Sequence, residues 1–480
     1  MMAYAATSPV MSALETVGNR LTGGAFAAGG ESALACQGCH SPIGVARGEF
    51  PTFEESEGRP LGEFASDTAA RGLTCDFCHQ ISGPDHAGSL GGDGIANAAF
   101  LLAVGDTKFG PFDDPFPNEF HEGERSDYLR SSEFCGTCHD VRLGGQDAKT
   151  GEPFLRLEDA FTEWKESPYA TTDNPFGRVT SCQDCHMSAF PYEPPGTYVT
   201  DLAANFPGAQ PRSVSSHYFT GVDVALVDFP GQDGDEIDGH GFPVAQSVRR
   251  RDLLRATCDF ELESPAAVAP GTDLRLEVAI TNVGAGHNVP TGFSQERQMW
   301  VELIVRDGAG ELLYETGTLR DSAHPETGEL APDGNLDDED LRNLVGTIDP
   351  VTLEADLVPG PDHDERPGRN RGLKNFGNEF KRIAPDGTEE EVFVPFLANH
   401  MDNGHSIPPL ETARVLYDVP VPAAAVGPIS VETRLRFRAF PPRFLRTLSA
   451  ARPDLIDEAL VDRNRIVDMA EAEASIALAP

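Results

Sequence analysis

Four short stretches of the sequence decide the fold: Cys36-Gln37-Gly38-Cys39-His40, Cys75-Asp76-Phe77-Cys78-His79, Cys135-Gly136-Thr137-Cys138-His139 and Cys182-Gln183-Asp184-Cys185-His186. Each reads C-x-x-C-H, which is the attachment signature of c-type haem. Two thiols at this spacing reach the two vinyl groups of one porphyrin, and the adjacent histidine becomes the proximal ligand of the iron. The motifs use eight of the nine cysteines. The sequence therefore predicts four covalently bound haem c groups, with His40, His79, His139 and His186 as proximal ligands.

Three other uses of paired cysteines account for the pattern less well. A zinc ribbon is built from C-x-x-C pairs, but it does not require a histidine after every second cysteine. A thioredoxin-like redox motif occurs once, beside a strand–helix unit. A disulfide framework is typical of short secreted chains, whereas this chain has 480 residues. The regularity of the motifs therefore favours haem attachment.

Composition limits the kinds of partner. The chain carries 37 Lys and Arg against 77 Asp and Glu, which gives a formal net charge of −40. Nucleic-acid binding needs a basic face to contact phosphates, so we exclude nucleic acid. We expect redox partner proteins with a basic docking face, and we keep self-association open. With 39% hydrophobic and 24% charged residues, the chain is expected to fold into several globular domains.

The chemistry of haem attachment also predicts a location. Covalent attachment normally takes place after export, so we predict an extracytoplasmic protein, in the periplasm, at the cell surface or outside the cell. The sequence has no run approaching the roughly 20 apolar residues of a membrane span. Residues 1–30 lack a charged n-region and a clear apolar h-region, and we interpret them as a candidate remnant of an export signal.

Residues 31–255 form the predicted tetrahaem domain. They are rich in Gly, Pro and Asp, a composition that suits short helices and loops around haems, so we expect a mainly α and coil fold packed by the porphyrins. One helix is predicted over 155–167, where Leu157, Phe161 and Trp164 share a face and a proline follows.

Residues 256–440 change to the strand period and predict an all-β sandwich of immunoglobulin-like type. An acidic insert over 321–391 reads as surface loop, and a helical tail is predicted over 441–480. Cys258, the ninth cysteine, opens this half; we expect a buried structural thiol, with intermolecular pairing as the alternative. The predicted strands cover 273–281, 300–305, 312–315, 413–419 and 429–438.

Nine histidines lie outside the motifs and could bind the second face of an iron. The favoured candidates are His121, shortly before the third motif, and His217, shortly after the fourth. His86 and His287 are further candidates. The alternates are His240, His400 and His405, and the two in the acidic insert, His324 and His363, are expected to be solvated.

His287 lies in an unusual loop, Gly284-Ala285-Gly286-His287-Asn288-Val289-Pro290-Thr291-Gly292. We interpret the glycines as allowing backbone angles closed to other residues, and the proline as fixing the chain just after the histidine. The loop is therefore expected to pack on the haem domain, where His287 either binds an iron or hydrogen-bonds a propionate. The alternative is that it only braces the strand connection.

Several phrases of the sequence resemble multihaem cytochromes of the cytochrome c-554 type. The resemblance implies extracytoplasmic electron transfer, largely bis-histidine ligation, and distal roles for His121 and His217. Relatives often carry a histidine shortly before the first or second motif, and this chain has none there. The resembling stretches are Arg71 to His79, Phe109 to Phe112, Ser131 to Val141, Glu163 to Tyr169, Cys182 to Met187 and Ser216 to Phe219, and in the β-half Gly286 to Gly292, Arg297 to Glu302 and Ile407 to Thr412.

Two classes of function follow from these observations. Four haems attached within a short stretch of chain lie close together, which favours an electron carrier, alone or as a subunit of a filament or complex. The alternative is an oxidoreductase that acts on a small nitrogen or sulfur species at a haem with one open axial position. A weaker reading gives the β-half a docking role.

Overall fold

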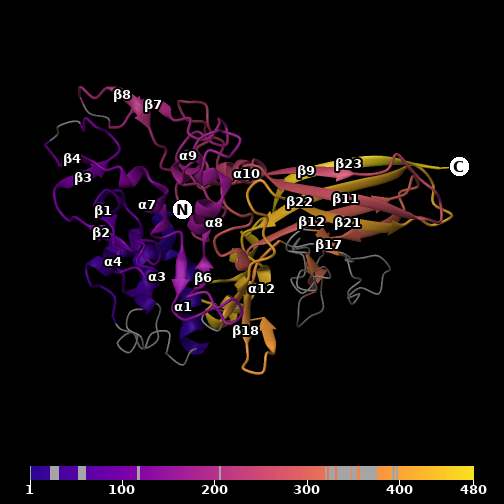
Figure 1. The fold of residues 1–480 in the computed structure, drawn as a ribbon, viewed down its shortest axis with the longest axis horizontal. Helices are drawn as coiled ribbons and strands as arrows, with labels where there is room; N and C mark the ends of the chain where they lie inside the picture. Colours follow the sequence, from indigo (N-terminus) through magenta and orange to yellow (C-terminus); the bar gives the residue numbers. More distant parts are fainter. Residues whose placement is uncertain are drawn as a thin grey trace.

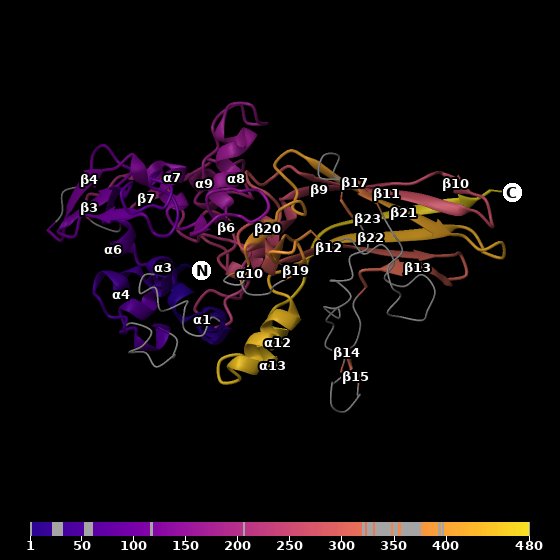
Figure 2. The same ribbon diagram turned by 60° about the horizontal axis from the view of Figure 1, so that its bottom comes forward.

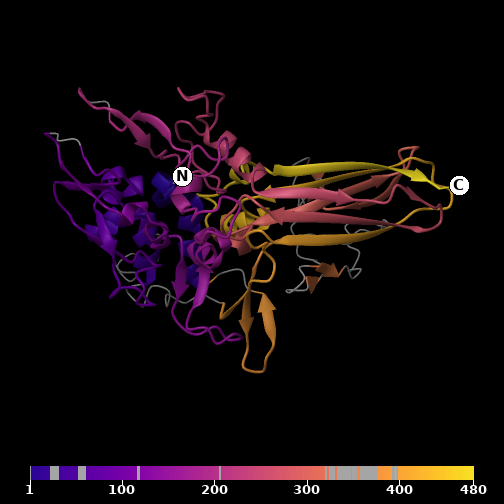
Figure 3. The ribbon, with the colours of Figure 1, turned by 45° about the horizontal axis from the view of Figure 1, so that its top comes forward.

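The computed structural model describes residues 2–21, 32–51, 61–115, 119–204, 207–318, 376–391, 395 and 398–479, together with four short strands between 319 and 375. Helices and two-stranded sheets form the first half, and long strands of the second half run away from it (Figure 1). The C-terminus lies at the far tip of these strands, and the N-terminus lies near the junction of the two halves, as the turned views also show (Figures 2 and 3).

Each C-x-x-C-H motif coincides with a short helix. Side-chain caps start two of these helices: Thr74 Oγ1 accepts a hydrogen bond from the Phe77 amide, and Ser181 forms a capping box with Asp184, which satisfies amides that the first turn leaves unpaired. The motif helices are α3 (Ser32–His40), α6 (Cys75–Cys78), α7 (Ser132–Gly136) and α9 (Cys182–His186).

Short elements connect the motifs. The helical ones are α4 (Pro42–Ala46), η2 (Leu61–Phe64), η3 (Ala69–Arg71), η4 (Tyr128–Arg130), η5 (Pro168–Ala170) and α10 (Gln246–Arg255). The paired strands are β1 (Ile81–Pro84) with β2 (Phe100–Leu102), β3 (Thr107–Gly110) with β4 (Glu122–Arg125), and β7 (Val199–Leu202) with β8 (Pro211–Val214).

The helix predicted over 155–167 is two elements. Strand β6 (Leu155–Glu158) pairs with β5 (Val141–Leu143), and only then does helix α8 (Ala160–Glu166) begin. Leu155 and Leu157 are both buried, so the first part follows the two-residue period of a strand. The predicted end before Pro168 is confirmed, because Ser167 caps α8.

The N-terminal segment is part of the folded core. Residues 2–21, which the sequence suggested as part of an export-signal remnant, form η1 (Met2–Thr7) and α1 (Pro9–Leu21). Val10 and Ala13 are buried in the same hydrophobic core as Phe444 and Leu448 of the C-terminal helix α12 (Pro442–Ala451). This segment therefore joins the two halves.

The β-half contains two five-stranded sheets. Inward-facing residues of both, such as Leu276 and Tyr417 of one and Leu303 and Phe437 of the other, belong to one hydrophobic core, as expected of packed sheets. One sheet has the order β16 (Thr347–Ile348), β17 (Glu354–Asp356), β21 (Thr412–Pro420), β11 (Asp273–Asn282), β9 (Cys258–Glu263); the other has β10 (Ala267–Val268), β23 (Val467–Leu478), β22 (Ile429–Arg438), β12 (Gln298–Arg306), β13 (Leu312–Thr316).

The prediction of a helical tail is wrong for its last part. After α12 and α13 (Glu458–Asp462), residues 467–478 form the long strand β23, which pairs antiparallel with β22. The Ala/Glu-rich stretch has high helix propensity, but it places Met469 and Ile476 in the core. An available sheet edge and burial outweigh local preference here.

Part of the acidic insert is structured rather than surface loop. Residues 376–391 supply Phe376 and Phe380, which are both buried, and the strands β18 (Glu379–Ile383) and β19 (Glu389–Glu391). These two strands form a small sheet with β20 (His400–Asp402), in the order β19, β18, β20. Two further strands of the insert, β14 (Ser322–Ala323) and β15 (Leu330–Ala331), pair with each other. Residues 337–340, His324 and His363 lie outside the described residues.

Cys258 begins β9 and is buried in the main core as a free thiol. Burial raises the pKa of this thiol to about 12, as expected for a structural cysteine. Within the described segments, the helices are too short or too polar to cross a bilayer.

Candidate functional site

The site is a large cavity lined mostly by residues of the first half, called here the haem half (residues 2–255), and partly by residues of the β-half such as His287 and Phe437. Its volume is about 2590 Å³, well above the roughly 300–1,000 Å³ of a pocket for one drug-sized ligand. All eight motif cysteines and all four motif histidines line it. The sequence predicted these twelve residues, and the fold brings them to one place.

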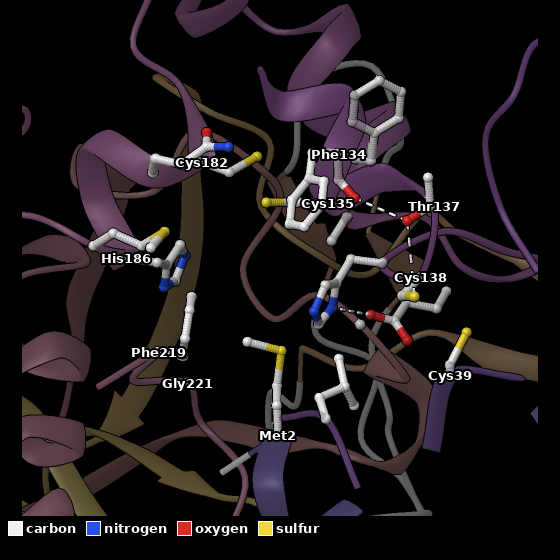
Figure 4. A pocket seen from close by; sticks show the side chains of 18 of the residues that line it. Met2, Cys39, Phe134, Cys135, Thr137, Cys138, Cys182, His186, Phe219 and Gly221 are labelled. Atoms are coloured by element: carbon white, nitrogen blue, oxygen red, sulfur yellow. Dashed lines mark hydrogen bonds and ion pairs between the residues drawn. The ribbon is translucent and has the colours of Figure 1, made fainter. Parts of the chain in front are cut away.

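The third motif is the centre of this arrangement. Cys138 lies close enough to Cys39 to raise the pKa of the Cys39 thiol, and Cys182 does the same for the pKa of Cys135. Figure 4 shows the sulfurs of Cys135 and Cys182 next to each other at the cavity, with Cys39 beside Cys138. The charge of Cys138 is also close enough to raise the pKa of Cys78, after the larger effect of burial. The third motif thus adjoins the other three.

Each motif histidine is oriented by a hydrogen bond at Nδ1. Such a bond fixes the ring and leaves Nε2 for a metal. The acceptors are the main-chain oxygens of Ala5 for His40 (3.3 Å), Phe109 for His79 (2.5 Å) and Thr220 for His186 (2.9 Å), and the carboxylate Oε1 of Glu158 for His139 (3.2 Å).

Two motif histidines face a second imidazole. The ring centroids of His79 and His217 are 6.3 Å apart with planes 31° apart, and those of His186 and His287 are 6.4 Å apart with planes only 12° apart. Burial lowers the pKa of His287 to about 4, so this ring is neutral at neutral pH.

Contacts with the haem half hold the His287 loop in place. Glu163 of α8 accepts hydrogen bonds from the Asn288 amide (3.1 Å) and from Thr291 Oγ1 (2.5 Å), and Tyr169 Oη donates to the Val283 carbonyl (2.7 Å). The loop therefore packs on the haem half, as its sequence predicted.

The two glycines of this loop serve a different purpose from the one expected. Neither Gly284 nor Gly286 has a positive φ. A Cβ on Gly284 would overlap the Ala256 carbonyl oxygen, and one on Gly286 would lie 3.2 Å from the Trp164 ring. Close approach, rather than backbone angle, requires glycine here.

The other histidine candidates lie elsewhere. Of the described histidines outside the motifs, His217 and His287 line the cavity, whereas His121 and His86 are exposed and do not. The alternates have carboxylate neighbours: His240 contacts Asp201, buried His400 hydrogen-bonds Asp147, and His405 lies 3.8 Å from Asp402.

Sequence reasoning missed two arginines near the cavity, Arg297, which is buried and lines it, and Arg250, which is half-buried. Arg297 pairs with Asp223 at 2.6 Å through Nη2, and Arg250 Nε donates to the Val222 carbonyl. Arg297 Nε and Arg250 Nη2 are left without a hydrogen-bond partner. Burial lowers the pKa of Arg250 to about 10. Buried unpaired guanidinium N–H groups are costly, and their preferred partner is a carboxylate, which is the group that a haem propionate presents. No local pattern marks these arginines, because each is surrounded by residues distant in sequence.

The residues present fit haem. Paired thiols and oriented imidazoles surround one large cavity, and Arg297, with one N–H group that has no hydrogen-bond partner, also lines it. A structural zinc needs about four ligands, and in the described part of the chain no three His, Cys, Asp or Glu side chains are placed to hold one metal ion.

Comparisons with known proteins agree at the level of the fold. No protein-family model matches the sequence, and no curated protein does. Four motif helices lie around one cavity and are joined to a β-half. One solved structure with a similar fold is a penta-haem cytochrome c552 from Thermochromatium tepidum, with a TM-score of 0.50 and 17% identity, covering 92% of this chain and 83% of that one.

Proposed function

We propose that this chain is an extracytoplasmic tetrahaem c-type cytochrome that transfers electrons between closely spaced haems, one for each motif and numbered in chain order. The observation that carries the proposal is that all twelve motif residues line one cavity, with the third motif beside the other three. Haems held this closely can exchange electrons, and the protein tunes them through ligands, hydrogen bonds and burial.

The distal ligands of two haems follow from ring geometry. An iron between two imidazoles, with each metal–nitrogen bond at about 2 Å, places the ring centroids about 6 Å apart. The centroid distances of 6.3 Å for His79 with His217 and 6.4 Å for His186 with His287 match this separation. We assign His217 to haem two and His287 to haem four.

Other residues would bind the rest of the cofactor. The cysteines would form the thioether links, and Arg250 and Arg297 would pair with propionates. The bound haems supply the one-electron chemistry. We further propose that the β-half is an immunoglobulin-like sandwich that completes the haem cavity through His287, and that redox partners approach with a basic face because the chain carries a net charge of −40.

Haem content gives the direct test. Intact mass after denaturation should show four haem additions to the 51.5 kDa chain, and acid acetone should extract none. In a Cys75→Ala/Cys78→Ala variant we expect three covalent haems, with the other three attachments intact. Fewer than four in the wild-type protein, after expression with haem-maturation machinery, would overturn the proposal.

A second candidate function has its own support. Among the described residues, no second imidazole is stacked opposite His40 or His139, so haems one and three would be the candidates for an open position and for chemistry on a small nitrogen or sulfur species. Carbon monoxide added to the reduced protein distinguishes the two functions. Binding at one or two haems supports the enzyme, and no binding supports the electron carrier.

A further inference from the structure

One motif histidine has an environment unlike the other three. His40, His79 and His186 direct Nδ1 at neutral main-chain oxygens, whereas His139 directs Nδ1 at the Glu158 carboxylate, 3.2 Å away. The hydrogen-bond acceptors of the other three histidines belong to the main chain. Among the four, only the hydrogen bond of His139 therefore depends on the identity of an acceptor side chain.

Strand pairing places this carboxylate. In the β5–β6 pair, Val141 lies opposite Glu158, and Val141 follows His139 by two residues. Leu155 and Leu157 are buried in a small core with Phe380 and Met401 of the second half. Glu158 follows Leu157 on this strand and lines the cavity, as Leu155 and Leu157 also do.

A carboxylate acceptor changes the electronic character of the imidazole. A charged acceptor makes a stronger hydrogen bond than a neutral carbonyl and increases the basicity of a metal-bound histidine. A more basic ligand favours ferric over ferrous iron, since the outer hydrogen bond is one of the protein's means of tuning a haem. The side chain of Glu158 is 16% exposed and that of His139 is 51% exposed, so the carboxylate is largely withdrawn from water while the imidazole is not.

We propose that Glu158 is a positioning residue that lowers the reduction potential of haem three through His139. This inference rests on the proposed haem at the third motif. The third motif adjoins the other three. With a low reduction potential, haem three would pass electrons between its neighbours without remaining reduced itself.

The test is a redox titration of the full-length protein with all its haems, comparing wild type with Glu158→Gln. Glutamine keeps the size and an accepting oxygen but removes the charge. We expect one midpoint potential of the four to rise by about 59 mV, which is a tenfold change in a one-electron equilibrium constant, while the other three stay in place. Glu158→Asp, which keeps the charge, should restore part of the lowering.

Glu152→Gln is the matched control, because it removes the same charge from an exposed side chain that does not line the cavity. The proposal is overturned if Glu158→Gln shifts no single midpoint more than Glu152→Gln does, or if all four shift together. The intact mass of the wild type and of each variant distinguishes the failure of the two proposals. Fewer than four haems in the wild type refutes the haem assignment. Loss of haem only in Glu158→Gln shows that Glu158 is needed for folding or haem attachment, and it overturns this inference.

Discussion

Replacing His287 with alanine tests whether the β-half supplies a haem ligand. The ring of His287 lies 6.4 Å from that of His186 and nearly parallel to it, so the substitution removes the proposed sixth ligand of haem four. We expect this haem to change from low spin to high spin while covalent haem content stays the same. Its midpoint potential should rise, because a donor that favours the ferric state is lost.

The size of the rise can be estimated from metal-site energetics. Outer-shell partners of a metal ligand are worth about 10–100-fold in metal affinity, so a direct ligand selective for ferric iron should be worth at least about 100-fold. For a one-electron couple this is about 120 mV. The variant also loses a buried ring, and we expect a cost of about 2–4 kcal/mol in unfolding free energy, similar to other large-to-alanine changes in cores.

Electron paramagnetic resonance of the oxidised protein and a spectroelectrochemical titration measure these effects. His86→Ala is the control, because His86 is exposed and lies outside the cavity. Added imidazole should restore the low-spin signal in His287→Ala by filling the vacated position. Four low-spin haems and unchanged midpoints in the variant would refute the ligand role.

Two further predictions concern stability. Gly136→Ala should lower the unfolding free energy by about 1–3 kcal/mol, because the added Cβ would lie 2.6 Å from the Phe161 ring. Gly144→Ala is the control and should leave the unfolding free energy unchanged, because its Cβ would have no neighbour within 4 Å. Equal denaturation midpoints for the two variants would contradict the prediction. Burial raises the pKa of Glu296 to about 8, so its carboxyl takes up a proton on folding, and wild-type stability should fall by about 3–5 kcal/mol as pH rises from 4.5 through 8. Urea unfolding at pH 5 and pH 8 measures this fall, and Glu296→Gln should lose less unfolding free energy between the two pH values than the wild type does. The same pH dependence of stability in both proteins would show that Glu296 does not take up a proton on folding.

The positions of the motif residues and of most strands could be predicted from local patterns. Thioether attachment needs two thiols and a histidine within five residues, so the spacing alone predicts the twelve attachment residues. Alternation along 273–281 and 429–438 reflects burial of one sheet face, a property of neighbouring residues, and both appear as the strands β11 and β22. Alternation was harder to recognise in 467–478, where Ala and Glu also suit a helix.

Only the tertiary structure decided which side chains meet at each motif histidine. Glu158 reaches His139 through strand pairing, and His287 reaches His186 because a loop of the β-half docks on α8. Arg250 of α10 lies close enough to Arg297 for the charge of Arg297 to help lower its pKa, after the larger effect of burial, although the two are distant in sequence. The attachment chemistry could be predicted from the sequence alone, because that chemistry is covalent and local. The proposed ligation and tuning could be inferred only from the fold, because these depend on groups that long-range packing brings within a few ångströms.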